Sequence, residues 1–179
     1  MKKLKKGQRG FTLIEVLIVI TLTGLIAGGL TTTIMQVVTM SHRTANRMTA
    51  VRQVQQAGFW VSPDVQMSQP DEVDTGNDPG TPEFELLTLG WIEFEGAANP
   101  THEVIYTLED GELWRSHSVG GGVPTVIRVA EYIDSDPQKT KCEIVAGELG
   151  DELKFTVTAT VGEQSETKIY RIKPRPESS

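Results

Sequence analysis

Apolar residues are concentrated in one uninterrupted run near the start of the chain. From Val16 to Met35 the sequence has 20 residues and no Asp, Glu, Lys or Arg. At about 1.5 Å of rise per residue, a helix of this length covers roughly 30 Å, which matches the apolar thickness of a bilayer. The pattern predicts a single membrane-spanning helix and excludes a multi-span membrane protein.

A helical pattern continues past this run. Several apolar residues fall on one face at 100° per residue: Ile34, Val37, Val38, Ala45, Met48 and Phe59. A helix from Phe11 to Val61 would be roughly 75 Å long, so its C-terminal half is expected to cover a sheet. We expect the helix to occupy residues 11–62 and to stop at Pro63, because the residue before a proline is disfavoured in the helical region.

The remainder of the chain has a different pattern. Residues 63–83 contain four prolines and two glycines, so they are predicted to form an irregular, acidic linker. Short alternating runs of apolar and polar residues predict a β-rich head over residues 84–173, with about six strands, followed by a tail at 174–179. The predicted fold class is α+β, with a long N-terminal hydrophobic helix packed on a mostly antiparallel sheet.

Two local details of the head follow from the same pattern. Asp110-Gly111, placed between alternating runs, is a strong signal for a two-residue hairpin turn. This turn would pair Leu108 with Leu113 across the two strands. A change in apolar parity near Gly90 predicts a β-bulge or a bend near that point.

Charge is also distributed unevenly along the chain. The first ten residues contain five Lys or Arg and no acid, whereas the rest contains 12 basic and 24 acidic residues, a net charge of −12. The positive-inside rule then places the N-terminus in the cytoplasm and the head outside the inner membrane. The acidic remainder would repel nucleic acid, so no nucleic-acid partner is expected. Cys142 is the only cysteine, which excludes an intrachain disulfide.

Glu15 is an anomaly, because it lies among apolar residues at the start of the predicted helix. A carboxylate at the centre of a bilayer costs about 2.5 to 3.5 kcal/mol. A close amine would compensate that charge. A cut between Gly10 and Phe11 would create such an amine four residues away, or a neighbouring copy could supply it. The alternative is that Glu15 lies near the membrane interface and is hydrated there.

The basic stretch 2–9, followed by Gly10-Phe11-Thr12-Leu13-Ile14-Glu15 and an apolar helix, resembles the class III leader of type IV prepilins and type II secretion pseudopilins. The resemblance implies that prepilin peptidase removes residues 1–10 by cutting after Gly10, and that it methylates the new amine of Phe11. It also implies that Glu15 pairs with the N-terminus of a neighbouring subunit during filament assembly. The motif spans about thirty residues.

The main alternative for this segment is a conventional secretory signal peptide that ends at Ala27-Gly28-Gly29. Glu15 inside the apolar core and the apolar residues beyond Gly29 argue against it. Within the pilin class, many major pilins have a proline at the position of Thr32 and two cysteines that close a C-terminal loop. Neither feature is present here, which favours a minor subunit. The hairpin sequence 104–115 resembles one that recurs in minor pseudopilin J and minor pilin W.

The residues do not indicate catalysis. The three histidines lack the HExxH spacing of metalloproteases, and Ser116 and His117 are strand neighbours that point to opposite faces. Gly120-Gly121-Gly122 lacks the Lys and Ser or Thr of a phosphate-binding loop. We therefore expect no enzymatic activity and no cofactor.

A calcium site in the linker is the one cofactor that the sequence leaves open. Asp71, Glu72, Asp74 and Asp78 could supply oxygen ligands, which suit calcium. Their spacing does not match an EF-hand and lacks its closing glutamate. A solvated acidic loop is the preferred interpretation.

The sequence thus predicts a structural minor pilin or pseudopilin that is assembled into a type IV pilus or a type II secretion pseudopilus. Its expected partners are prepilin peptidase, other pilin subunits, an inner-membrane platform protein, an assembly ATPase and the membrane itself. The expected location is the inner membrane, as a single-pass protein, and then the filament. The alternative is a membrane-anchored binding or adhesion module that does not enter a filament.

Overall fold

The computed structural model describes residues 12–76, 83–93, 99–147 and 150–176. The chain forms two units, residues 1–42 and residues 43–179. The helix α1 (Leu13–Met67) begins in the first unit and ends in the second. The elements that follow in the chain are η1 (Pro70–Glu72), β1 (Val73–Asp74), β2 (Glu83–Ile92), β3 (Thr101–Glu109), β4 (Glu112–Val119), β5 (Thr125–Ala130), β6 (Lys141–Gly147), β7 (Gly150–Val161) and β8 (Gln164–Ile172).

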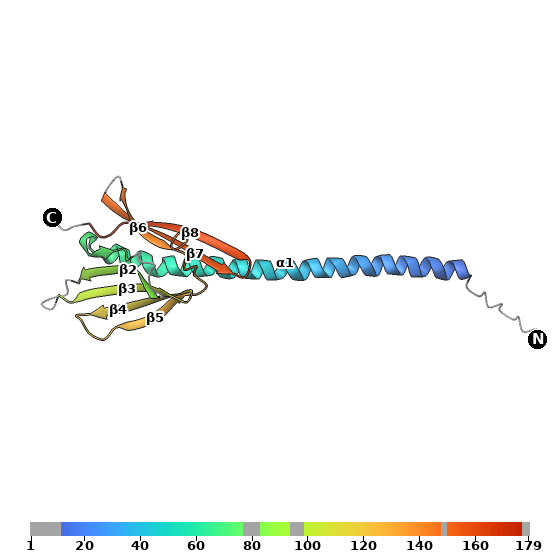
Figure 1. Cartoon of the computed structure of the whole chain (residues 1–179), viewed down its shortest axis with the longest axis horizontal. Helices are drawn as coiled ribbons and strands as arrows, with labels where there is room; N and C mark the ends of the chain where they lie inside the picture. The colour runs from blue at the N-terminus through green and yellow to red at the C-terminus, as the bar shows by residue number, and fades with distance from the viewer. Residues whose placement is uncertain (1–11, 77–82, 94–98, 148–149, 177–179) are drawn as a thin grey trace, which may run out of the picture. The chain divides into compact units, whose positions relative to one another are not determined.

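The strands form two antiparallel sheets, not one. A five-stranded sheet has the order β1-β2-β3-β4-β5, and a three-stranded sheet has the order β6-β7-β8. Figure 1 shows the two sheets on opposite sides of the C-terminal half of α1. The α+β class and the antiparallel strands are therefore confirmed, whereas the expectation of a single sheet of about six strands is wrong.

The hairpin between β3 and β4 has the predicted register. Leu108 pairs with Leu113, and Thr107 pairs with Trp114. Asp110 has φ of 47° and Gly111 has φ of 78°, as a type I′ turn requires. The predicted bulge lies elsewhere: Gly90 pairs regularly with Glu103, and the register shifts between Glu85 and Leu87 instead.

The buried face of α1 differs from the predicted one. Five residues at helical spacing face the core: Ala50, Val54, Ala57, Val61 and Val65. Met48 and Phe59, which belong to the predicted stripe, are 62% and 70% exposed. The prediction was wrong because it favoured large side chains, whereas a helix between two sheets approaches them most closely through small residues.

The helix also continues past its predicted stop. Pro63 lies inside α1, which ends at Met67. Pro63 is on the exposed side, where water can reach the Phe59 carbonyl that loses its partner N–H. The next two residues, Asp64 and Val65, are buried against the rest of the head. This burial offsets the cost of the proline, so the linker predicted from residue 63 begins later.

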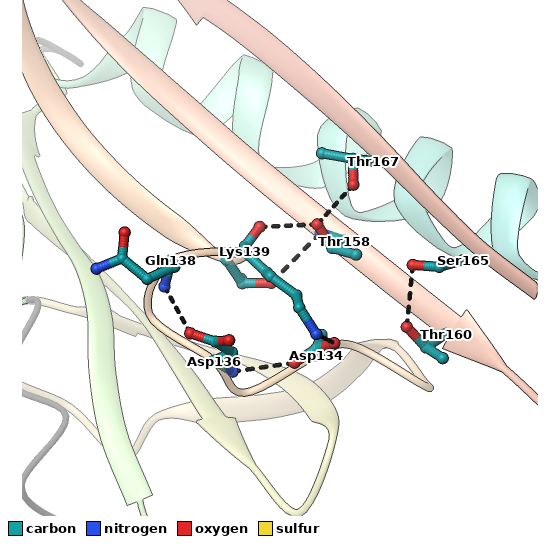
Figure 2. Close-up of polar contacts among 9 residues, drawn as sticks. Asp134, Asp136, Gln138, Lys139, Thr158, Thr160, Ser165 and Thr167 are labelled. Carbon is teal, nitrogen blue, oxygen red and sulfur yellow. Dashed lines mark hydrogen bonds and ion pairs between the residues drawn. The ribbon is translucent and has the colours of Figure 1, made fainter.

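The connection between β5 and β6 is held by polar contacts (Figure 2). The Lys139 ammonium lies 2.7 Å from Asp134 Oδ2, and the Asp136 N–H donates to Asp134 Oδ1. Burial alone would raise the pKa of Asp134, but the hydrogen bonds from Lys139 and Asp136 outweigh it and lower that pKa. Thr158 Oγ1 donates to the Lys139 carbonyl at 2.8 Å, which attaches the loop to β7.

Candidate functional site

The proposed cleavage site at Gly10 and Phe11 lies outside the residues that the structure describes. The described chain starts at Thr12, whose carbonyl accepts hydrogen bonds from the N–H groups of Glu15 and Val16. Thr12 therefore precedes the first turn of α1, which begins at Leu13. In the mature chain that the motif implies, this first turn would follow the new N-terminus almost at once.

Glu15 lies in the first turn of α1 and its side chain is exposed. The positive end of the helix macrodipole favours a carboxylate at this position. Thr12-x-x-Glu15 also has the spacing of a capping box, in which a glutamate three residues after the cap can accept from the cap N–H. Two roles thus compete for Glu15, a local helix cap and a charge partner for another chain.

The described part of unit 1 is apolar and exposed. Large apolar side chains that are at least 47% exposed include Leu13, Ile14, Val16, Leu17, Ile18, Val19, Ile20, Leu22, Leu25, Ile26, Leu30, Ile34 and Met35. In water such a surface would be strongly unfavourable. By length and composition α1 can cross a membrane, and the lipid would cover this surface.

The threonines of this segment do not conflict with an apolar environment. Thr21, Thr23 and Thr31 each donate their hydroxyl to the backbone carbonyl four residues earlier, at distances of 2.5 to 2.9 Å. Thr33 and Thr39 do the same. Because each hydroxyl is satisfied within the helix, burying it in lipid leaves no unpaired donor.

The glycines of this segment have no packing role within the described chain. A Cβ added at Gly24, Gly28 or Gly29 would meet nothing within 4 Å. Glycine lowers helix stability relative to alanine. Small residues spaced by four do allow another helix to approach closely. The spacing of Gly24 and Gly28 is thus suited to contact with a different chain.

A buried polar network attaches α1 to the five-stranded sheet. Asp64 accepts two hydrogen bonds from Arg115, from Nε at 2.7 Å and from Nη2 at 2.9 Å, and a third from the Tyr106 hydroxyl. Tyr106 and Arg115 are directly opposed on β3 and β4. Both residues lie in the hairpin sequence 104–115, whereas Asp64 lies 51 positions before Arg115 and gives no local signal in the sequence.

The electrostatics of this network follow from burial and proximity. Burial, and then the charge of Asp64, raises the pKa of Tyr106, so its hydroxyl stays protonated and donates. The hydrogen bond to Asp64 likewise raises the pKa of Arg115. The guanidinium carbon of Arg115 lies 5.6 Å from the centre of the Trp60 ring, a cation–π contact with the same helix.

The possible calcium ligands are only partly described, because Asp78 lies outside the described residues. Within residues 12–76, 83–93, 99–147 and 150–176, no group of three or more His, Cys, Asp and Glu side chains is arranged to hold a metal ion. The preferred interpretation, a solvated acidic loop without calcium, therefore stays a prediction. His102 and His117, two of the three histidines that lack the HExxH spacing, lie side by side and are part-buried.

Comparison with known families supports the interpretation of the N-terminus. Residues 5–31 match a family model described as a prokaryotic N-terminal methylation motif. The match includes Gly10, Phe11 and Glu15 and covers a small part of the chain. No curated protein and no solved structure matches the chain. The methylation motif and the apolar helix support a membrane-anchored, pilin-type protein, and together with the fold they favour a structural role.

Proposed function

We propose that this protein is a structural minor pilin or pseudopilin. Prepilin peptidase would cut between Gly10 and Phe11 and methylate Phe11, and the mature chain would enter a type IV pilus or a type II secretion pseudopilus. The observation that carries the proposal is the match of residues 5–31 to the methylation motif, directly before an apolar helix with an exposed surface. The antiparallel sheets on the C-terminal half of α1 are consistent with a pilin head.

Assembly would move the apolar helix from lipid into contact with other subunits. The exposed side chains of unit 1 would be covered in both states. Glu15 would then need an opposite charge, because a carboxylate in a low-dielectric core is costly unless paired. The methylated amine of a neighbouring subunit would supply that charge. The platform protein and the assembly ATPase would provide the force for extraction.

The cleavage proposal is tested by the mass of the mature N-terminus. Co-expression with a prepilin peptidase should yield a chain that starts at Phe11 and carries one added methyl group. Gly10→Leu should leave the leader attached, and Gly7→Leu, which changes a leader residue away from the cut, should be processed normally. A mature chain that starts after Gly29 would instead support a secretory signal peptide and contradict the proposal.

The role of Glu15 is tested by three substitutions that separate charge from capping. Glu15→Gln keeps a capping-box side chain but removes the charge, Glu15→Asp keeps the charge, and Glu15→Ala removes both. If Glu15 pairs with an amine, Gln and Ala should both reduce incorporation into sheared filaments, whereas cleavage continues. Normal incorporation of the Gln variant would assign Glu15 to helix capping only.

The filament itself is tested by fractionation. Incorporation predicts that the chain appears in sheared filaments or pilus fractions together with other pilin subunits. Retention of the processed wild-type chain in the membrane alone, with an intact assembly machinery, would favour an anchored binding or adhesion module.

A further inference from the structure

Three aromatic rings from neighbouring strands form a platform in the five-stranded sheet. The rings of His102 and Trp91 are stacked, with their centres 5.0 Å apart and their planes inclined by 6°. The ring of His117 also stacks on Trp91, at 5.8 Å and 19°. The Trp91 side chain is buried, at 5% exposure. The two imidazoles therefore lie on one indole surface that fixes their orientation.

The two imidazoles and Glu93 form a hydrogen-bonded chain. Glu93 Oε2 lies 2.9 Å from His102 Nε2, and His102 Nδ1 lies 3.0 Å from His117 Nε2. A carboxylate only accepts, so Glu93 places the proton of neutral His102 on Nε2. This leaves the lone pair of His102 Nδ1 directed at His117. If His117 carries its proton on Nδ1, the lone pairs of the two rings face each other.

We propose that His102 Nδ1 and His117 Nε2 together bind a late first-row divalent transition-metal ion such as Cu²⁺ or Zn²⁺. Imidazole nitrogens are preferred ligands of these ions. Two nitrogens at about 2.0 to 2.1 Å from a tetrahedral ion are roughly 3.3 to 3.4 Å apart. The ring centres lie 5.3 Å apart and the two nitrogens 3.0 Å apart, so the nitrogens face each other almost head-on. Metal binding would therefore require both rings to turn slightly as well as to separate.

The surroundings of the pair support this site. In many metal sites a carboxylate accepts a hydrogen bond from the ring nitrogen of a histidine that does not bind the metal, and so orients the ring. Glu93 would have this role for His102, through the contact with Nε2. Burial, and then the positive charge of Arg115, lowers the pKa of His117. Arg115 would repel a cation, but its charge is neutralised by the bidentate contact with Asp64. The described residues provide two ligands, so water would complete the coordination.

Trp91 provides a direct readout, because bound Cu²⁺ quenches the fluorescence of a nearby indole. Full-length protein in a mild detergent, titrated with CuCl₂ near neutral pH, should show saturable quenching at one ion per chain. The double variant His102→Ala/His117→Ala should lose this phase. His42→Ala, which removes the third histidine in the other unit, should keep it. Glu93→Gln should weaken binding by about 10 to 100-fold.

A second measurement does not depend on the folding of a variant. Electron paramagnetic resonance of the wild-type Cu²⁺ complex should show coupling to two imidazole nitrogens, and Zn²⁺ should displace the ion. In the Trp91→Phe variant, Cu²⁺ should cause little fluorescence quenching, but calorimetry should still detect Cu²⁺ binding. Equal quenching in the double-histidine variant, or a copper signal from oxygen ligands alone, would overturn the proposal and leave a neutral histidine pair. Neither result depends on leader cleavage or filament assembly.

Discussion

Asp64 lies in the last turn of α1, where the negative end of the helix macrodipole disfavours a carboxylate. Its side chain is nevertheless buried, at 7% exposure. Arg115 and Tyr106 together donate three hydrogen bonds to it. A buried charge with partners on two strands fixes the position of the helix end, because any shift of α1 along the sheet would leave that charge unpaired.

Arg115→Leu should therefore lower the free energy of unfolding by about 3 kcal/mol, because it leaves the Asp64 carboxylate buried without its cation. Urea unfolding of the full chain in mild detergent measures this change. Asp64→Leu/Arg115→Leu should recover much of the loss, since it removes both charges. Arg128→Leu is the matched control: Arg128 also bridges Glu112 and Glu131, but on the surface, and its loss should leave unfolding nearly unchanged. Equal effects of the two arginine variants would contradict the assigned role.

The raised pKa of Tyr106 predicts a pH dependence of stability at alkaline pH. The unfolded chain loses the tyrosine proton near pH 10, whereas the folded chain retains it. The contribution of Tyr106 to stability is thus fully present below about pH 10 and declines as the pH rises further. Urea unfolding between about pH 9 and pH 11 should show a shallower decline in Tyr106→Phe than in wild type. Tyr132→Phe, at a half-exposed position, should keep the wild-type decline, and identical slopes in all three proteins would refute this assignment.

At the scale of the elements, α1 and β8 meet at a position that tolerates only glycine. A Cβ at Gly58 would overlap the ring of Tyr170. The hydroxyl of that ring donates to the Val54 carbonyl at 2.9 Å, so the ring cannot move away without losing this bond. The close contact explains why a residue of poor helix propensity lies in the middle of a helix.

Gly58→Ala should lower the free energy of unfolding by about 1 to 3 kcal/mol through overpacking. In a Tyr170→Ala background the same substitution should be neutral or stabilising, because only the gain in helix propensity remains. Gln56→Ala, at an exposed position of the same helix, is the control and should not destabilise. A Gly58→Ala penalty that persists without Tyr170 would show that the ring is not its cause. Chemical denaturation of the wild type, the two single variants Gly58→Ala and Tyr170→Ala, and the double variant completes a double-mutant cycle.

The elements that the sequence predicted well are those with local signals. The Asp110-Gly111 turn follows from two adjacent residues, and the apolar run that begins α1 follows from composition. The buried face of α1 and the helix end at Met67 depend on two sheets that form later in the chain, so periodicity alone assigned them wrongly. The contacts of Asp64 with Arg115 and of His102 with His117 join residues 51 and 15 positions apart. Such pairs become visible only with strand register.

At the scale of the whole molecule, the core belongs to one unit and the anchor to the other. All buried apolar residues in the described chain lie between Ala50 and Ile172. Residues 1–42 contain five basic residues and Glu15, a net charge of +4. Because the whole chain carries −7, residues 43–179 carry −11. An acidic unit with its own core has the properties of an independent soluble domain.

Residues 43–179 should therefore fold without the anchor and without detergent, because removing residues 1–42 takes away apolar surface but no part of the core. Cys142 gives a simple measurement. Burial raises the pKa of its thiol, so a thiol reagent at neutral pH should leave it unmodified in the folded fragment and modify it in urea. Ser135→Cys adds a second thiol, in an exposed loop. In the folded fragment this variant should react rapidly at residue 135 alone, and in urea it should react at residue 135 and at Cys142. If Cys142 in the fragment reacts equally fast with and without urea, while the full-length chain protects it, the head requires its anchor to fold.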